Sequence, residues 1–362
     1  MLSDLDFMER ALFLATRGRG RTSPNPLVGA VVVSAEGVVV GHGAHERAGE
    51  PHAEVHALHE AGARARGGTL YCTLEPCSHT GRTGPCVVRI AEAGIARVVA
   101  AVEDPNPLVN GRGFSFLRDR GVAVDVGVGR DAALRLNQPF FTFIREHRPF
   151  VILKAATSLD GRIAAGAGQR TTLTSAGADR RTHLLRAEVD AIGVGSATVI
   201  VDDPLLTVRG VYRERPLVRV IFDRRLRTPP TARIFSTLEQ GAVIMMTSVG
   251  AAADEPRAAA LRAAGARLEV VSGADGVRGA LDRLGDLGIT SLLLEGGATL
   301  HAAFWDAGFV DYAHVYVTPH VLGPAGVPFA GGRAVPLAGL FEQRVEACGP
   351  DVLIEGYVHR PH

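Results

Sequence analysis

Apolar residues in the first part of the chain recur in two alternating patterns. Runs at 27–33 (LVGAVVV) and 38–43 (VVVGHG) predict a pair of strands, whereas residues 53–65 (AEVHALHEAGARA) have the spacing of a helix. The same patterns predict a helix at 86–94, closed by Gly94, and strands at 69–74, 96–102 and 122–128. Strands that alternate with helices are typical of a layered α/β domain.

Residues 136–150 (LNQPFFTFIREHRPF) interrupt this alternation with two prolines and two arginines among aromatic residues. We therefore predict a domain boundary near residue 147, which divides the chain into domains 1–147 and 148–362. A second series of strands follows, at 150–156, 189–195, 216–223, 241–248, 291–297 and 313–319. This half is also predicted to be α/β.

Composition and charge narrow the class of protein. The chain has 362 residues, of which 46% are hydrophobic and 21% charged, as in globular proteins. Its formal net charge of +1 is too small to favour binding to nucleic acid or to an anionic membrane. No apolar run approaches the length of a membrane span, and residues 1–20 look like an amphipathic helix rather than a signal peptide. We therefore expect a soluble cytoplasmic protein without a nucleic-acid or membrane partner.

The cysteines are clustered. Three of the four, Cys72, Cys77 and Cys86, fall within fifteen residues, and the fourth is Cys348. In a reducing compartment, clustered cysteines favour a metal site or a catalytic site over disulfides. We expect Cys72, inside a predicted strand, and the isolated Cys348 to be structural.

His52 and Glu54 stand at the start of the predicted helix, and Cys77 and Cys86 each follow a proline. One imidazole and two thiolates give three protein ligands, the number that a catalytic zinc site uses when water takes the fourth position. Glu54, in the first turn of the helix, is placed to take a proton from that water. The pattern is that of zinc nucleobase deaminases, except that eight residues separate the two cysteines instead of two.

A structural zinc site is the alternative. It would need a fourth protein ligand, for which His79 is available, but it leaves Glu54 without a role. We therefore favour the catalytic reading.

Two glycine motifs in the second half are candidates for cofactor binding. Gly193 and Gly195 follow a predicted strand, but the third glycine of a dinucleotide fingerprint would be Thr198, so a Rossmann fold is weakly supported. Gly296 and Gly297 lie between a predicted strand and a helix, where backbone amides could hold a pyrophosphate. Both motifs fit equally well as tight turns without a ligand.

Four stretches of the first half, SPNPLVGAVVV, GHGAHERAGEPHAEVHAL, TLEPCSHTGRTGPC and DPNPLVNGRG, resemble the deaminase domain of the bifunctional RibD family of riboflavin-biosynthesis enzymes. The eight-residue gap between the cysteines fits that family. The resemblance implies a cytidine-deaminase-like domain of three layers. It also implies a substrate, 2,5-diamino-6-ribosylamino-4(3H)-pyrimidinone 5′-phosphate, whose C2 amino group would be replaced by oxygen with Glu54 as the proton shuttle.

By the same resemblance, zinc would be held by His52, Cys77 and Cys86, and the substrate would be contacted by Asn25, His45, His79 and Arg82. Arg82 is suited to the ribose phosphate, and an amide such as Asn25 to a heterocycle. The alternative for SPNPLVG is a tight turn that binds no ligand, because proline and asparagine are turn residues.

The second half resembles the reductase domain of the same family in LKAATSLDGRIA, LTSAGADRRTHLLRAEVDAIGVGSATVIVDDPLLTVR and LLLEGGATLHAAF. The resemblance implies a dihydrofolate-reductase-like α/β domain, in which NADPH supplies hydride to the sugar carbon and ribose opens to ribityl. NADP contacts are then expected from Ala156, Thr172, Thr198, Asp202, Arg224, Gly297, Ala298, Thr299, Leu300, His301, Ala302 and Ala303. Substrate contacts are expected from Arg170, Arg186, Leu206, Arg209 and Glu295. Two of these arginines, Arg186 and Arg209, suit a phosphate, although surface arginines are common.

Three residues depart from the pattern of the family. Thr172 stands where the family usually has Trp, Arg170 where it has a small hydroxyl residue, and Arg224 where it has Ser. The Trp would pack on the cofactor, so Thr172 changes the contacts near the nicotinamide. Arg224, together with Arg225, could pair with a 2′-phosphate, which favours NADP over NAD.

The leading hypothesis is therefore a bifunctional zinc deaminase and NADPH reductase that acts on a phosphorylated pyrimidine and, like the family, forms a homodimer or homotetramer. The first alternative keeps the deaminase but gives the second domain an altered substrate or cofactor. The near-zero net charge disfavours a nucleic-acid base deaminase with an RNA-binding tail. Glu54 disfavours a binding module that carries only a structural zinc knuckle.

Overall fold

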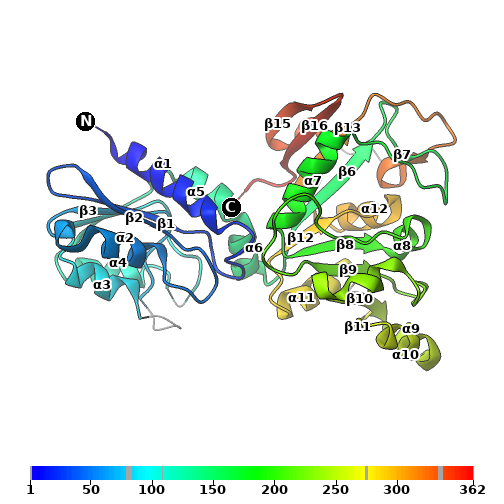
Figure 1. Cartoon of the computed structure of the whole chain (residues 1–362), viewed down its shortest axis with the longest axis horizontal. Helices are drawn as coiled ribbons and strands as arrows, with labels where there is room; N and C mark the ends of the chain where they lie inside the picture. The colour runs from blue at the N-terminus through cyan, green and yellow to red at the C-terminus, as the bar shows by residue number, and fades with distance from the viewer. Residues whose placement is uncertain (1, 79–83, 108, 274–275, 333–336, 362) are drawn as a thin grey trace. The chain divides into compact units, whose positions relative to one another are not determined.

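The computed structural model describes residues 2–78, 84–107, 109–273, 276–332 and 337–361. The chain divides into two compact units, Met1–Glu146 with Pro361–His362, and His147–Arg360 (Figure 1). Each unit has its own main sheet and its own hydrophobic core.

The first unit is a sheet between two layers of helices. Its strands lie in the order β2 (Val39–Ala44), β1 (Gly29–Val33), β3 (Thr69–Cys72), β4 (Arg97–Ala100) and β5 (Ala123–Val126). β1 is antiparallel to both of its neighbours, and the last three strands are parallel. Figure 1 shows α1 (Asp4–Ala15) and α5 (Arg130–Leu136) on one face, and α2 (Ala53–Ala61), α3 (Cys86–Glu92) and α4 (Arg112–Arg118) on the other.

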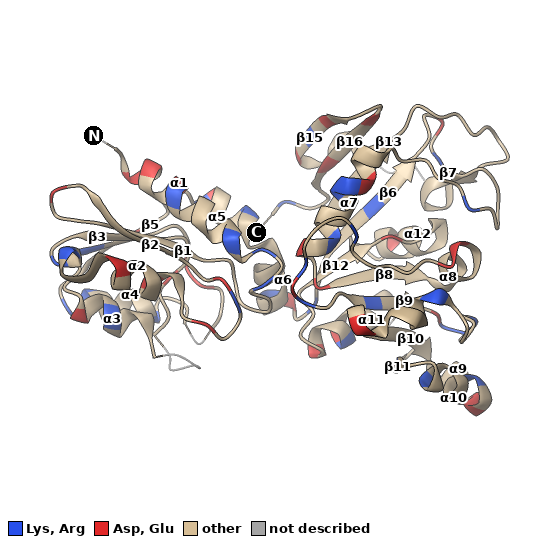
Figure 2. Ribbon diagram, in the orientation of Figure 1, with Lys and Arg blue, Asp and Glu red and all other residues tan. Residues whose placement is uncertain are grey.

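Burial on both faces explains the composition of β1. All five of its residues, GAVVV, are buried, because helices cover the sheet from both sides. Figure 2 shows no charged residue on this strand, whereas α2 and α3 carry several.

The second unit is built on nine strands. Their order is β11 (Ala266–Val271), β10 (Val243–Ser248), β9 (Val218–Phe222), β8 (Ala191–Gly195), β12 (Ser291–Leu294), β6 (Phe150–Thr157), β13 (Tyr312–Val317), β16 (Asp351–Tyr357) and β15 (Phe341–Cys348). The strands from β11 to β13 are parallel, and the hairpin of β16 and β15 adds an antiparallel edge. A separate pair consists of β7 (Arg162–Ala164) and β14 (Val327–Pro328).

Two clusters of apolar side chains form the core of this unit. Leu292 and Leu294 belong to one cluster and Leu293 to the other, because successive side chains of a strand point to opposite faces. The helices of the unit are α7 (Ala176–Glu188), α8 (Ser196–Asp202), α9 (Val249–Ala252), α10 (Glu255–Ala263), α11 (Gly276–Asp286) and α12 (Ala298–Asp306).

The strands predicted from the apolar pattern are confirmed in both units. The sequence did not lead us to expect α6 (Gln138–Glu146), which occupies the segment that interrupts the alternation. Its Pro139 is the second residue of the helix, where no backbone N–H is needed, so the proline does not prevent helix formation. In the described parts of the chain, every helix is too short or too polar to cross a membrane.

Candidate functional site

Close packing of α2 on β2 places His52 and Glu54. A Cβ atom on Gly43 of β2 would lie 2.2 Å from the carbonyl oxygen of Ala53, so only glycine allows this approach. His52 is the N-cap residue of α2 and has an extended backbone, and Glu54 is the second residue of the helix. Both side chains therefore belong to the first turn of α2, as the sequence predicted.

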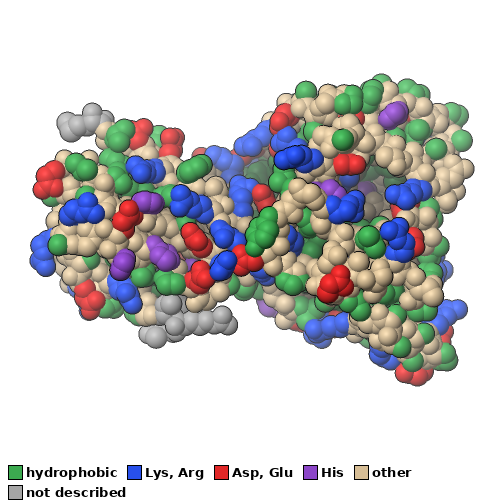
Figure 3. All heavy atoms as spheres, viewed as in Figure 1, with side chains coloured by type: hydrophobic (Ala, Val, Ile, Leu, Met, Phe, Trp, Pro, Cys, Tyr) green, Lys and Arg blue, Asp and Glu red, His purple; other side chains and the backbone are tan. Residues whose placement is uncertain are grey.

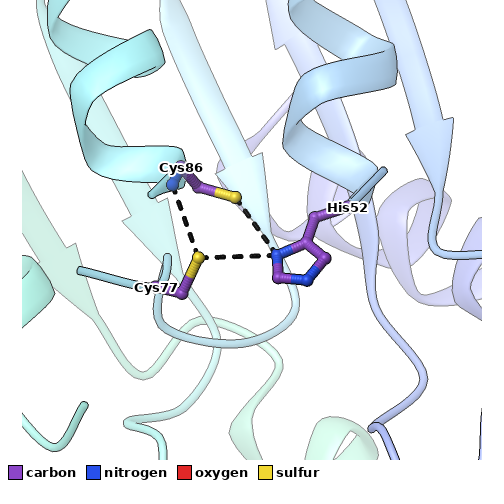
Figure 4. Close-up of side chains that lie close together, drawn as sticks. All are labelled: His52, Cys77 and Cys86. Atoms are coloured by element: carbon purple, nitrogen blue, oxygen red, sulfur yellow. Dashed lines mark hydrogen bonds between the residues drawn. The ribbon is translucent and has the colours of Figure 1, made fainter. Parts of the chain in front are cut away.

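The side chains of His52, Cys77 and Cys86 meet at one point (Figure 4). His52 Nδ1 lies 3.5 Å from Cys77 Sγ and 3.3 Å from Cys86 Sγ. The backbone N–H of Cys86, the first residue of α3, donates to Cys77 Sγ at 3.4 Å. Cys77 follows β3 in the chain, so three separate segments supply the three side chains.

This arrangement fits a zinc ion. Tetrahedral ligands at about 2.3 Å for sulfur and about 2.0 Å for nitrogen are about 3.5 Å apart. The potential ligand atoms of His52, Cys77 and Cys86 all lie within 4.8 Å of one another. Two soft thiolates and one imidazole also match the ligand preference of zinc.

The protonation of these groups shows how strongly they interact. A hydrogen bond from the Cys86 thiol lowers the pKa of Cys77 to about 4, and the same contact raises the pKa of Cys86. A hydrogen bond to Cys77 raises the pKa of His52 to about 9, against the effect of burial.

Glu54 is buried next to this cluster. Its side chain is 3% exposed, and its Oε2 atom has no hydrogen-bond partner among the described residues. Burial raises the pKa of Glu54, and the positive charge of His52 opposes that shift. A buried carboxylate oxygen without a protein partner is suited to bind and move a proton of water or substrate.

Asn25 and His45 lie beside the cluster. Asn25 Nδ2 is 3.2 Å from His45 Nε2, and His45 Nδ1 is 3.2 Å from the carbonyl oxygen of Pro51. Since that carbonyl only accepts, His45 donates from Nδ1 and accepts the Asn25 amide at Nε2. The His45 ring meets the His52 ring edge-on at 5.2 Å, and burial lowers the pKa of His45, which favours the neutral ring. His79 and Arg82 lie outside the described residues.

The second unit contains a cavity of about 1640 Å³. Basic side chains surround a hollow on this face of the unit in Figure 3. All five predicted substrate contacts and all predicted NADP contacts except Ala302 line the cavity. Ala302 points elsewhere, because its Cβ is 3.8 Å from the Cβ position of Gly331.

Two of the predicted substrate contacts bind one another. Arg186 donates from Nε and Nη2 to the two carboxylate oxygens of Glu295, at 2.7 and 2.8 Å, and from Nη1 to the Thr207 carbonyl at 3.1 Å. Burial would raise the pKa of Glu295, but the Arg186 charge outweighs it and holds that pKa at about 2. Arg186 therefore keeps only part of its donors for a phosphate, whereas Arg209 is exposed at the same cavity.

The sequence analysis did not predict Lys154 as a site residue, but this residue of β6 lines the same cavity. Its charge contributes to the low pKa of Glu295. A single lysine inside the otherwise apolar strand FVILKAAT is the signal that could have identified it, because an unpaired charge in a buried strand is costly.

A His–Cys–Cys cluster with a buried carboxylate beside it defines the first unit as a zinc-dependent deaminase. Comparison with known proteins agrees with this class. Residues 1–102 match the model of the cytidine and deoxycytidylate deaminase zinc-binding region, and residues 149–354 match the model of the RibD C-terminal domain.

Full-length relatives extend the match. The chain is 42% identical to the riboflavin biosynthesis protein RibD of Aquifex aeolicus over 97% of each chain, and 41% identical to RibD of Escherichia coli over 89% of each. Among solved structures, RibD of Acinetobacter baumannii matches with a TM-score of 0.86 and 35% identity, covering 98% of this chain and 99% of that one.

A further structure, from Thermotoga maritima, is described as a diaminohydroxyphosphoribosylaminopyrimidine deaminase and 5-amino-6-(5-phosphoribosylamino)uracil reductase. It has a TM-score of 0.83 and 34% identity, and 97% of each chain is covered. The present chain belongs to the RibD family of bifunctional deaminase–reductases. Its two units thus have the cytidine-deaminase-like and dihydrofolate-reductase-like folds that the sequence predicted.

Replacement of the buried carboxylate tests the role of Glu54. We expect Glu54→Gln to lower ammonia release by about 10²- to 10⁴-fold, because an amide cannot carry the proton. Zinc content, measured by atomic absorption, should stay unchanged, since Glu54 is not one of the three ligands. Glu60→Gln, at the exposed end of the same helix, is the matched control. Undiminished ammonia release by Glu54→Gln would rule out this role.

Proposed function

We propose that this chain catalyses two consecutive steps of riboflavin biosynthesis. Residues 1–147 would deaminate 2,5-diamino-6-ribosylamino-4(3H)-pyrimidinone 5′-phosphate, and residues 148–362 would reduce the product to 5-amino-6-ribitylaminouracil 5′-phosphate. The main support is the meeting of His52, Cys77 and Cys86 next to a buried oxygen of Glu54 that has no described partner. Family membership supplies the substrate class.

In the deamination, three residues would hold zinc, Glu54 would transfer protons, and Asn25 and His45 would contact the substrate. Zinc held by His52, Cys77 and Cys86 would supply the Lewis acidity that makes water a nucleophile near neutral pH. Glu54 would take one proton from the water and pass it to a ring nitrogen as the C2–O bond forms. It would then carry the proton of the new hydroxyl group to the amino group, so that the C2–N bond breaks and ammonia leaves while the C2–O bond becomes a carbonyl. Asn25 and His45 are already ordered by their mutual hydrogen bond, which leaves the Asn25 carbonyl oxygen for the heterocycle.

In the reduction, the cavity of the second unit would bind cofactor and substrate together. NADPH would supply the hydride for the sugar carbon. Gly297 is the N-cap residue of α12 and offers no side-chain cap, so the first backbone N–H groups of this helix at the cavity could bind phosphate oxygens. Glu295, held by Arg186, would offer a fixed carboxylate to substrate hydroxyl groups, and Arg209 would meet the substrate phosphate.

One assay tests both activities. Purified protein is given the diaminopyrimidinone phosphate and NADPH, and ammonia release and NADPH oxidation are followed in parallel. We expect both signals, with Arg170 and Thr172 tolerated in the cavity. Ammonia without NADPH oxidation would favour the alternative, a second unit with an altered substrate or cofactor. If folded, zinc-loaded protein gave neither ammonia nor NADPH oxidation, that result would contradict the proposal.

The loop after β9 supports a preference for NADP. Asp223 accepts hydrogen bonds from the backbone N–H and the hydroxyl group of Thr228, at 2.7 and 2.8 Å, and so closes a tight loop. This loop presents Arg224 and Arg225 to the cavity. A fixed pair of guanidinium groups would bind the 2′-phosphate that distinguishes NADP from NAD.

Replacement of one arginine tests this preference. We expect Arg224→Ser to raise the KM for NADPH about 10-fold, since a hydrogen bond to a charged group contributes about 1.5 kcal/mol or more. The KM for NADH should not change. Arg257→Ser, on the exposed surface of α10, is the control. An unchanged KM for NADPH in Arg224→Ser would show that this residue does not read the phosphate.

We also propose that the chain forms a homo-oligomer, as its family does. The edge strand β15 supports this proposal, because seven of its eight residues are exposed and Val345 is 64% exposed. An exposed edge strand with apolar residues is a template for pairing with a second copy. The cytoplasmic location stays a prediction, supported by the free state of all four cysteines.

Light scattering tests the association. We expect a mass of two or four chains for the unsubstituted protein, and a shift toward the single chain for Val345→Lys, which places a charge on the edge strand. Val270→Lys, at an exposed valine of the opposite edge strand β11, should leave the mass unchanged. A single-chain mass without any substitution would contradict the proposal.

A further inference from the structure

A second buried carboxylate of the first unit, Glu75, lies outside the zinc ligands and Glu54. It is 3% exposed and stands in the chain between β3 and Cys77. Its backbone N–H donates to the carbonyl oxygen of Val102 at 2.9 Å. The loop that carries Cys77 is therefore held against the segment that follows β4.

Four backbone N–H groups bind the Glu75 carboxylate. Oε2 accepts from Asp104 at 3.2 Å and from Gly111 at 2.9 Å, and Oε1 accepts from Gly113 at 2.9 Å and Phe114 at 3.4 Å. Burial raises the pKa of Glu75, whereas these four hydrogen bonds oppose that shift because they favour the ionised form. Residues 104–107 and 109–114 thus supply four N–H groups that converge on one side chain.

These residues are also bonded to one another. Asp104 Oδ1 accepts the backbone N–H of Asn106 at 2.8 Å, and the Asn110 amide donates to the Asp104 carbonyl at 3.2 Å. The backbone N–H of Asn110 also donates to the carbonyl oxygen of Asn106 at 2.9 Å. These bonds join Asp104, Asn106 and Asn110, so a change at the Glu75 carboxylate would displace several of the described residues together.

Residues 109–114 also pack directly on the residue before Cys77. A Cβ atom on Gly113 would lie 2.2 Å from the Pro76 carbonyl oxygen, so the two backbones are in contact. Glu75 and Pro76 together therefore fix the distance between residues 109–114 and the cluster of His52, Cys77 and Cys86.

We infer that Glu75 is a positioning residue for the deamination: its carboxylate holds residues 104–107 and 109–114 against the Cys77 loop and so fixes the wall beside the zinc ligands. The inference rests on the proposed deaminase function. Glu75 touches neither the ligand side chains nor Glu54 in any described hydrogen bond, so it would act through the backbone that it organises.

Glu75→Gln removes one accepting oxygen and turns an NH₂ group toward two N–H donors. We expect the KM for the diaminopyrimidinone phosphate to rise about 10- to 100-fold, the range typical of residues that orient a metal site from outside. Zinc per chain and kcat per zinc should stay within about 3-fold of the unsubstituted values, because the three ligands and Glu54 are retained. Glu103→Gln, at the exposed residue immediately before Asp104, is the matched control and should leave the KM unchanged.

The second unit provides an internal control for folding. NADPH oxidation with 5-amino-6-(5-phosphoribosylamino)uracil should be the same in Glu75→Gln and the unsubstituted chain. An unchanged KM in Glu75→Gln would overturn the inference. So would a loss of activity that only follows lost zinc or a lower melting temperature, because that pattern indicates a structural role alone.

If Glu75→Gln does not fold, Glu75→Asp takes its place. It keeps the charge but shortens the side chain by one methylene, so the four N–H groups cannot all be reached, and the KM should still rise. An unchanged KM in this variant overturns the inference. The proposed deaminase function fails if the unsubstituted chain releases no ammonia. The inference about Glu75 alone fails if the unsubstituted chain releases ammonia and the variant has an unchanged KM.

Discussion

The first unit depends on two helix N-termini that meet at one point. α2 begins immediately after His52, and α3 begins at Cys86, so the 3.3 Å contact between these side chains brings both helix ends together. The N-terminus of a helix carries a partial positive charge, which stabilises thiolates. This constraint explains why α2 must pack closely on β2 at Gly43: any side chain there would push the helix, and with it His52 and Glu54, away from the cysteines.

Both units contain buried carboxylates, but the groups that bind these carboxylates differ between the two units. Glu75 is bound by four neutral N–H groups, whereas Glu295 is bound by the guanidinium group of Arg186. Burial raises the pKa of both Glu54 and Glu75, but four N–H groups oppose that shift at Glu75, whereas one oxygen of Glu54 has no described partner. Hydrogen bonds from N–H groups favour the ionised form of a carboxylate and hold it in place, whereas an oxygen without such a partner is open to a proton of water or substrate. The three acids therefore have different tasks because their surroundings differ.

Much of the fold could be predicted from the sequence, because strands that are buried consist mainly of apolar residues. Strands covered on both sides are almost entirely apolar, such as β1 and, after Ser291, β12, and their positions follow from that pattern alone. The hairpin of β15 and β16 could not be predicted in this way, because β15 is exposed on both faces and has the mixed sequence FEQRVEAC. The helix α6 was hidden by Pro139, which interrupts the pattern in the sequence but not the helix.

The candidate site shows the same limit. His52, Cys77 and Cys86 could be recognised together because a metal requires particular residue types at particular spacings. The pairing of Arg186 with Glu295 could not, because 109 residues separate them and either residue alone looks like a surface charge. Glu75 was missed for a related reason: its partners are backbone N–H groups, and the sequence does not distinguish one backbone from another.

The two sites also tolerate change differently. In the deaminase site, the ligands and the proton carrier are side chains of this chain, so each residue type is required by the chemistry. In the reductase cavity, the cofactor carries the chemistry and the protein supplies binding and orientation. Thr172, Arg170 and Arg224, which depart from the family's usual residues, all lie in that cavity. Their exchange can shift affinity or preference without removing a reacting group. The departures are therefore found where the physical demands on residue identity are weakest.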